Sequence, residues 1–166
     1  MDSPTDKQLL EIADTVAKTL CQRGWMMAAA ESCTGGWVAK VCTDLPGSSV
    51  WFERGFVTYT NEAKQEMLGV QQHTLEDSGA VSETTVAEMA QGALAHSRAQ
   101  VSLAISGIAG PGGATPDKPV GTVCFAWAVT GQDVLTERQC FDGDRESVRR
   151  QAVGHALEGV LRLLNG

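Results

Sequence analysis

Two short and almost wholly apolar runs, at residues 26–30 and 101–105, constrain the fold of this chain most. Each run is too short for a typical helix and long enough for a strand that is buried on both faces. Each also passes directly into a turn rich in glycine and hydroxyl groups. Because a strand buried on both faces needs helices on either side of its sheet, the pattern predicts an α/β domain.

Helical patterns separate the predicted strands. Apolar residues recur at helical spacing from Leu9 to Leu20, and Gly24 is expected to end that helix. Ser3, followed by proline, is expected to start it. Further helices are predicted at residues 37–43, at residues 62–68 with Asn61 as the cap, after Ser82, and after Asp144 as the cap.

The remaining strand signals lie at residues 56–59, 121–129 and 134–141. A turn through Gly131 joins the last two, which predicts an antiparallel hairpin. With no internal repeat or linker in the sequence, residues 1–166 are expected to form one domain. We predict a three-layer α/β/α sandwich with a mixed, mostly parallel sheet.

Composition excludes several classes of partner. Thirteen basic and twenty acidic residues among 166 leave a net charge of −7, and the basic residues do not cluster, so no nucleic-acid partner is expected. No apolar run approaches the roughly 20 residues of a membrane helix, so we expect a cytoplasmic protein without a membrane partner. Five cysteines without a C-x-x-C pair, together with three scattered histidines, predict no zinc site, and no metal or cofactor is expected.

Three loops rich in hydroxyl groups and glycine are candidate ligand sites: residues 31–36, 46–49 and 106–113. Ligands of open α/β sheets bind where strands end, and glycine lets backbone N–H groups approach an anion. None of these loops matches an ATP or dinucleotide motif. If Asn61 is the cap, Lys64 occupies the third helical position, where the helix dipole disfavours its charge. A lysine with a lowered pKa suits a general base, whereas a solvated surface lysine is the alternative.

Several ordered motifs together resemble the CinA C-terminal domain family, over residues 9–164. They are Ala30-Glu31-Ser32-Cys33-Thr34-Gly35-Gly36, Pro46-Gly47-Ser48-Ser49, Gly55-Phe56-Val57-Thr58-Tyr59-Thr60-Asn61-Glu62-Ala63-Lys64 and Ser106-Gly107-Ile108-Ala109-Gly110-Pro111. The motifs Pro119-Val120-Gly121-Thr122-Val123 and Phe141-x-Gly143-Asp144-Arg145 also fit. The family often has threonine where this chain has Ser106, and the hydroxyl is kept.

The resemblance implies hydrolysis of the carboxamide of nicotinamide mononucleotide, in the recycling of NAD, by a serine–lysine pair that needs no metal. Carried onto this chain, Ser49 would be the nucleophile, Lys64 its base and Tyr59 an assisting hydroxyl. Ser32 and Ser106 would lie near the amide and its oxyanion, and Arg145 would hold the phosphate. Thr34, Gly35 and Gly107 are expected to complete the substrate site. Relatives of this kind form homodimers, which we expect here.

Three alternatives stay open. Ser48 is adjacent to Ser49 and could be the nucleophile instead. One of two adjacent serines in a turn commonly forms a hydrogen bond with the backbone, and we favour Ser49 as the nucleophile. Cys33 could act as the nucleophile with Glu31 and Lys64 in a nitrilase-like arrangement, although a cysteine more commonly packs as a small buried side chain. The chain could also be a catalytically silent nucleotide-binding or regulatory protein on the same fold.

Overall fold

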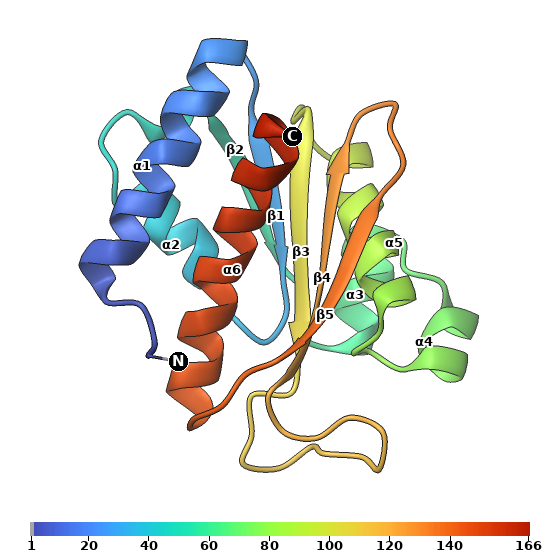
Figure 1. The fold of residues 1–166 in the computed structure, drawn as a ribbon. Coiled ribbons are helices and arrows are strands. Elements are labelled where there is room, and N and C mark those ends of the chain that lie inside the picture. Colours follow the sequence, from blue (N-terminus) through green and yellow to red (C-terminus); the bar gives the residue numbers. More distant parts are fainter. Residues whose placement is uncertain (1) are drawn as a thin grey trace.

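The computed structural model describes residues 2–166, which form a five-stranded sheet between two layers of helices (Figure 1). The strand order is β2-β1-β3-β4-β5. The strands are β1 (Met27–Glu31), β2 (Phe52–Val57), β3 (Val101–Gly107), β4 (Thr122–Val129) and β5 (Leu135–Cys140). Strand β1 pairs in parallel with β2 and β3, whereas β4 is antiparallel to both of its neighbours. Four strands therefore point the same way, which confirms the predicted mixed, mostly parallel sheet and its hairpin.

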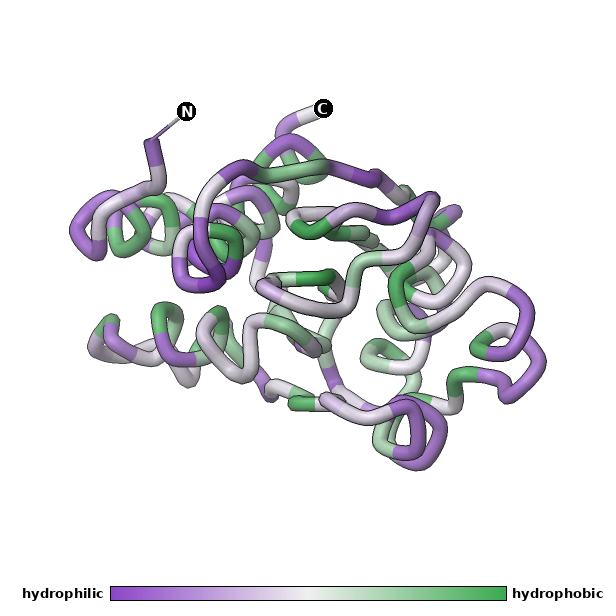
Figure 2. The backbone as a smooth tube through the Cα atoms, turned by 90° about the horizontal axis from the view of Figure 1, so that it is seen from below, coloured by the Kyte–Doolittle hydropathy of each residue, from purple (hydrophilic) through white to green (hydrophobic). Residues whose placement is uncertain are grey.

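Six α-helices cover the two faces of the sheet (Figures 1 and 2). One layer holds α1 (Asp6–Arg23), α2 (Trp37–Thr43) and α6 (Arg145–Asn165). The other holds α3 (Asn61–Leu68), α4 (Gln72–Ser78) and α5 (Glu83–Ala95). A short 3-10 helix, η1 (Ser48–Val50), precedes β2. The three-layer α/β/α sandwich is thus confirmed.

Some boundaries differ from the prediction, and hydrogen bonds explain the differences. The cap of α1 is Thr5, because its side chain and that of Gln8 form a reciprocal capping box that the Ser3-Pro4 pair cannot form. Thr60 caps α3 through the Ala63 amide, so Asn61 is the first helical residue. Strand β2 begins earlier than predicted and ends at Val57, and α4 was not predicted.

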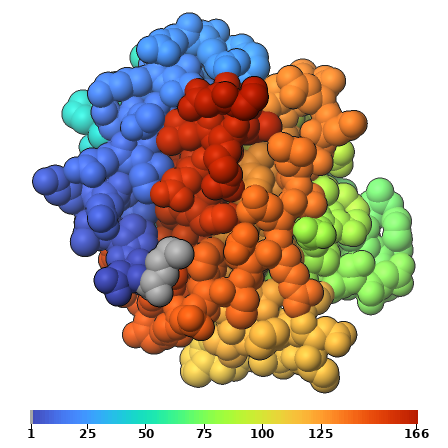
Figure 3. Space-filling view, viewed as in Figure 1, coloured from blue at the N-terminus to red at the C-terminus, as the bar shows by residue number. Residues whose placement is uncertain are grey.

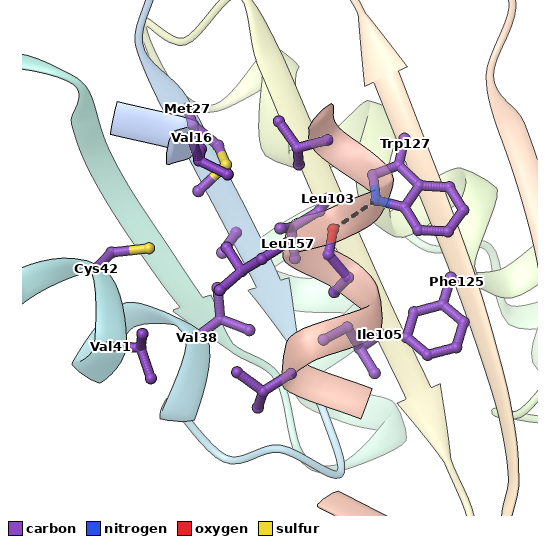
Figure 4. Packing of buried hydrophobic residues seen from close by; sticks show 14 of the residues in the cluster. Val16, Met27, Val38, Val41, Cys42, Leu103, Ile105, Phe125, Trp127 and Leu157 are labelled. Atoms are coloured by element: carbon purple, nitrogen blue, oxygen red, sulfur yellow. Dashed lines mark hydrogen bonds between the residues drawn. The ribbon is translucent and has the colours of Figure 1, made fainter. Parts of the chain in front are cut away.

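The larger core lies between the sheet and the layer of α1, α2 and α6. Figure 4 shows Leu157 of α6 packed toward Leu103 and Val38. The Trp127 indole N–H donates to the Ala156 carbonyl at 2.9 Å. A Cβ at position 159 would lie 2.1 Å from the Trp127 ring, so only glycine there lets α6 pack this closely on β4. This packing holds α6 against the sheet.

On the opposite face, alanines let α5 approach the sheet closely. Ala28, Ala30, Ala104 and Ala126 lie in the second apolar cluster with α5. Helices α3 and α5 also meet closely, since a Cβ at Gly92 would lie 2.0 Å from the carbonyl oxygen of residue 68. Helix α3 is therefore held against α5, and this contact positions the side chains that α3 turns toward the sheet.

Candidate active site

A cavity of about 240 Å³ lies at the carboxyl ends of β1 and β3, the edge where the three parallel neighbours β2, β1 and β3 all end. Figure 2 looks onto this end of the molecule, with a helix layer on either side of the sheet. In Figure 3 the long loop after β3 projects beyond the body of the protein at the same end. The cavity is lined by Ser32, Cys33, Tyr59, Lys64, Ala80, Val81, Ser106, Gly107, Ala109 and Arg145.

Lys64 of α3 is the most unusual residue of this cavity, because its side chain is buried without a carboxylate partner. It is 1% exposed. Its Nζ donates to the Ser32 hydroxyl at 2.9 Å, to the Thr58 carbonyl at 2.9 Å and to the Tyr59 carbonyl at 3.3 Å. None of the salt bridges among residues 2–166 includes it. A lone buried ammonium is costly, so the site favours the neutral amine.

Burial lowers the pKa of Lys64 from its ordinary value of 10.5. The cause therefore differs from the helix dipole that the sequence suggested, since Lys64 is the fourth residue of α3 and its side chain leaves the helix for the strand ends. Two backbone carbonyls accept the N–H groups of a neutral amine, and its lone pair is then left for the Ser32 hydroxyl. A neutral amine beside a hydroxyl group is an arrangement that suits a general base next to a nucleophile.

Ser32 opens the turn after β1, and its buried neighbour Glu31 holds that turn. The Glu31 carboxylate accepts from the Thr34 hydroxyl at 2.7 Å, from the Val38 amide at 2.9 Å and from the Ala39 amide at 3.1 Å. Burial raises the pKa of Glu31, and these donors oppose that shift. Glu31 thus caps the first turn of α2 from a distance and fixes the residues between β1 and α2.

Arg149 of α6 holds the same turn from the other side. Its guanidinium donates to the Cys33 carbonyl at 2.9 Å and to the Thr34 carbonyl at 3.3 Å, and it lies 5.5 Å from the centre of the Trp37 ring. Nothing in the local sequence indicates this role, because it depends on α6 and β1 meeting at one end of the sheet.

Ser106 and Gly107 form the floor of the cavity at the end of β3. Ser106 is 1% exposed, and its hydroxyl has no hydrogen-bond partner among residues 2–166. A Cβ at Gly107 would lie 2.7 Å from a methyl carbon of Val123, so the close contact with β4 requires glycine. Both residues line the cavity, and their contact with a substrate stays a prediction.

Tyr59 and Arg145 lie at the mouth of the cavity. Tyr59 is 59% exposed, and its hydroxyl accepts from the Arg145 guanidinium at 3.2 Å. Arg145 also donates to the Gly110 carbonyl at 2.8 Å and has no acidic partner among the described residues. Its charge is therefore available to an anion, whereas that of nearby Arg150 is neutralised by Asp6 and Glu146.

The structure does not bring Ser49 and Lys64 together within one chain. Ser48 and Ser49 lie in η1, which leads into the start of β2, whereas Lys64 contacts the residues just after its end. Six strand residues that each advance about 3.3 Å separate the two places by about 20 Å. The serine that pairs with Lys64 is Ser32, which the sequence analysis placed at the amide but not as the nucleophile.

Two other residues expected to contact the substrate, Thr34 and Gly35, do not line this cavity. The Thr34 hydroxyl donates to Glu31 and is buried, and Thr34 does not line this cavity. Gly35 lines a neighbouring hollow with Trp37 and Arg150 rather than this cavity. Within this turn, Ser32 and Cys33 line the cavity, and the residues after them support it from behind.

The geometry also disfavours a cysteine nucleophile. Cys33 lines the cavity, but burial raises the pKa of its thiol to about 12, so little thiolate forms near neutral pH. The Glu31 carboxylate, which the nitrilase-like alternative needs in the site, is directed at α2. Elsewhere in residues 2–166, no group of three or more His, Cys, Asp or Glu side chains could hold a metal ion, and no helix is long and apolar enough to cross a membrane.

The sequence of the chain matches a known protein family and several named proteins. The model of the CinA C-terminal domain matches residues 9–164. The chain is 56% identical over 154 residues to the nicotinamide-nucleotide amidohydrolase PncC of Escherichia coli strain K12, covering 93% of each protein. It is 50% identical to a putative competence-damage inducible protein of Symbiobacterium thermophilum, of which it covers 38%.

Solved structures agree with these matches. The crystal structure of the competence/damage inducible protein CihA from Agrobacterium tumefaciens has a TM-score of 0.92 and 44% identity, covering 99% of this chain and 98% of that one. A competence damage-inducible protein of Klebsiella pneumoniae has a TM-score of 0.91 and 41% identity, covering 95% and 97%.

Proposed function

Since the chain belongs to the CinA C-terminal domain family, we propose that it is an amidohydrolase that converts nicotinamide mononucleotide to nicotinic acid mononucleotide and ammonia, in the recycling of NAD. The observation that carries the proposal is the contact between the buried Lys64 amine and the Ser32 hydroxyl. A serine hydroxyl is a poor nucleophile until a nearby base takes its proton. The high identity to proteins named as nicotinamide-nucleotide amidohydrolases supports the choice of substrate.

In the proposed first step, Ser32 Oγ attacks the carboxamide carbon and its proton passes to the neutral Lys64 amine. The oxygen of the carboxamide becomes an oxyanion, and the Ser106 hydroxyl, which has no partner within the described chain, is placed to donate to it. The carbon–nitrogen bond then breaks, and the Lys64 ammonium returns a proton to the leaving nitrogen. Ammonia departs and the acyl group remains as an ester on Ser32.

In the second step, Lys64 takes a proton from water, whose oxygen attacks the ester carbon. The bond to Ser32 breaks, the serine recovers its proton, and the acid product leaves. The sum is one amide and one water consumed for one acid and one ammonia. Two amine hydrogens bound to the Thr58 and Tyr59 carbonyls would keep the lone pair aimed at Ser32 throughout.

The mouth of the cavity suits the rest of the nucleotide. We propose that Arg145 binds the phosphate, because its planar guanidinium has no acidic partner among residues 2–166 and suits phosphate oxygens. Tyr59, whose hydroxyl contacts Arg145, would then orient the arginine and contact the substrate, rather than assist Lys64 directly. Ala80 and Val81 give the cavity an apolar wall for the ring.

The test is release of ammonia from nicotinamide mononucleotide by the purified protein, with and without a chelator. The account predicts release of ammonia and of the acid nucleotide in equal amounts, unchanged by the chelator, because an amine activates the nucleophile. If no ammonia is released, the alternative of a catalytically silent nucleotide-binding or regulatory protein explains the structure better. Release that stops in chelator and returns with a divalent ion would contradict the serine–lysine mechanism.

Two further parts of the proposal concern the setting of the reaction. We place it in the cytoplasm and in a homodimer, as the resemblance implies. Strand β2 lies at an edge of the sheet, with Val50 exposed just before it and Val57 exposed at its end, and thus offers a surface for a second copy. Analytical sedimentation of the protein at micromolar concentration tests the dimer. A monomer at this concentration would contradict the proposed homodimer.

A further inference from the structure

The cavity carries positive charge in a protein that is otherwise acidic. Lys64 and Arg145 both line it, and no aspartate or glutamate does. The chain as a whole has a net charge of −7. Arg145 is charged, and Lys64 becomes a second cation when it takes up a proton, so a cavity of this kind within an acidic protein attracts anions.

The groups around Lys64 leave a place for one carboxylate. From the turn after β1 it faces Ser32 and the thiol of Cys33, and from the end of β2 the carbonyls of Thr58 and Tyr59. The segment between α4 and α5 adds Ala80 and Val81, the end of β3 adds Ser106 and Gly107, and α6 adds the cation Arg145. The nearest buried acid, Glu31, is directed at α2. Among residues 2–166, no group therefore supplies a counter-charge to a protonated Lys64.

We propose that this cavity binds planar aromatic carboxylates through the protonated Lys64, and that the acid product of the amidase reaction therefore inhibits the enzyme. The second half rests on the proposed function; the first does not. A carboxylate differs from the carboxamide of the same ring by one group, yet only the carboxylate pairs with an ammonium. The apolar side formed by Ala80 and Val81 and the volume of about 240 Å³ suit a small flat ring.

The hydrogen bonds of Ser32 and Ser106 favour the acid further. With Lys64 protonated and donating to Ser32 Oγ, the hydrogen of Ser32 is free to donate to a carboxylate, as is that of Ser106. Such charge-assisted bonds are shorter and stronger than those to a neutral amide. The bound acid would hold Lys64 in the protonated form, which cannot act as the base.

The binding is expected to depend on pH through Lys64. A ligand that pairs with the ammonium binds fully below the pKa of Lys64 in the free protein and weakens as the pH rises through it. Burial lowers that pKa from 10.5, so the weakening falls below the range of an ordinary lysine. The thiol of Cys33, with its pKa of about 12, stays neutral across this range.

Calorimetry with nicotinate and nicotinamide tests the proposal without any turnover. Nicotinate is expected to bind about 10- to 150-fold more tightly than its amide, which is the range of a charge-assisted bond. Lys64→Met should remove the preference, and Lys40→Met, which removes the same charge outside the cavity, should keep it. A rise in pH on the unaltered protein should weaken nicotinate alone, a measurement that needs no variant to fold.

Equal affinity for acid and amide, or a preference that survives in Lys64→Met, would overturn the proposal. The outcome is separable from that of the proposed function. Lys64-dependent binding of nicotinate by a protein that releases no ammonia would keep the carboxylate site and remove the amidase. Ammonia release without a preference for the acid would do the reverse.

Discussion

The Nζ of Lys64 lies 2.9 Å from the hydroxyl oxygen of Ser32, although the two residues come from different elements on the two sides of strand β2 in the sequence. Lys64 reaches the contact from α3, and Ser32 stands in the turn after β1. The close approach of α3 to α5 positions Lys64, and the contacts of Glu31 and Arg149 position the turn that carries Ser32.

The rate should rise with pH as Lys64 loses its proton. A general base acts in its neutral form, so kcat/KM is expected to increase and then level off above the pKa of Lys64. Burial lowers that pKa from 10.5, and the plateau should therefore begin at a lower pH than an ordinary lysine would give. A pH profile of the unaltered enzyme checks this. The control variant Ser106→Ala is expected to be slower at every pH but to give a pH profile of the same shape. A rise centred near 10.5 would contradict a buried base.

Glu31→Gln should lower kcat while leaving KM within about threefold. The amide keeps the shape of the side chain but replaces one acceptor oxygen by an NH2 donor. That donor then faces the N–H of Ala39 or, if the amide is flipped, the N–H of Val38, which shifts the turn that carries Ser32. A displacement of about 1 Å can lower a rate by about 100-fold, which is the upper bound expected here. Steady-state kinetics beside thermal unfolding separates the effects.

Thr34→Val is the graded companion to that change, because it removes one of the donors to Glu31 and keeps the carboxylate. Its loss of kcat should be smaller. If both variants melt at lower temperature and keep the kcat of the parent, Glu31 stabilises the fold without positioning Ser32.

Arg145→Ala should act on the phosphate alone. A charge-assisted bond of about 1.5–3 kcal/mol corresponds to a loss of about 10- to 150-fold in kcat/KM for nicotinamide mononucleotide. The riboside, which has the same amide and no phosphate, should lose little. Arg145→Lys should recover only part, because an ammonium lacks the forked geometry. Arg150→Ala is the matched control, since its charge is already paired with Asp6 and Glu146.

Equal losses of Arg145→Ala on the nucleotide and the riboside would instead give Arg145 a structural role, through Tyr59 and Gly110. The phosphate site would then have to be sought elsewhere at the mouth of the cavity.

Gly92→Ala should destabilise the protein by about 1–3 kcal/mol, the range for overpacking of a core. The new Cβ would meet the carbonyl of residue 68 at 2.0 Å and push α3 away from α5. Gly154→Ala is a matched control within a helix, because its Cβ would meet side-chain atoms of Pro4 and Leu9 at 3.3 and 3.4 Å. Denaturant unfolding compares the two, and equal stabilities would show that α3 adjusts at no cost.

The sheet and most of the helices could be predicted from local patterns, because residues 26–30 and 101–105 are apolar on both faces and glycines such as Gly24 end helices in the left-handed conformation. Helix α4 was missed, since its cap Gln71 makes no side-chain capping bond. Lys64 was predicted as a base, although burial rather than the helix dipole lowers its pKa.

The partner of Lys64 could not be predicted, because it depends on which ends of which strands meet. Ser49 is near Tyr59 in the sequence but lies at the other end of β2, whereas Ser32 is brought close by the parallel pairing of β1 and β2. Arg149 was similarly out of reach, since α6 closes the turn after β1 only in the folded chain.

The most direct test of the central claim compares ammonia release from nicotinamide mononucleotide by the parent protein, Ser32→Ala and Ser49→Ala. The account predicts that Ser32→Ala falls by at least about 10³-fold, as expected when a nucleophile that acts as a unit with its base is removed, while Ser49→Ala stays within about threefold. A normal rate in Ser32→Ala together with an inactive Ser49→Ala would contradict the pairing of Ser32 with Lys64. Ser49 would then have to reach Lys64 from a second copy of the chain.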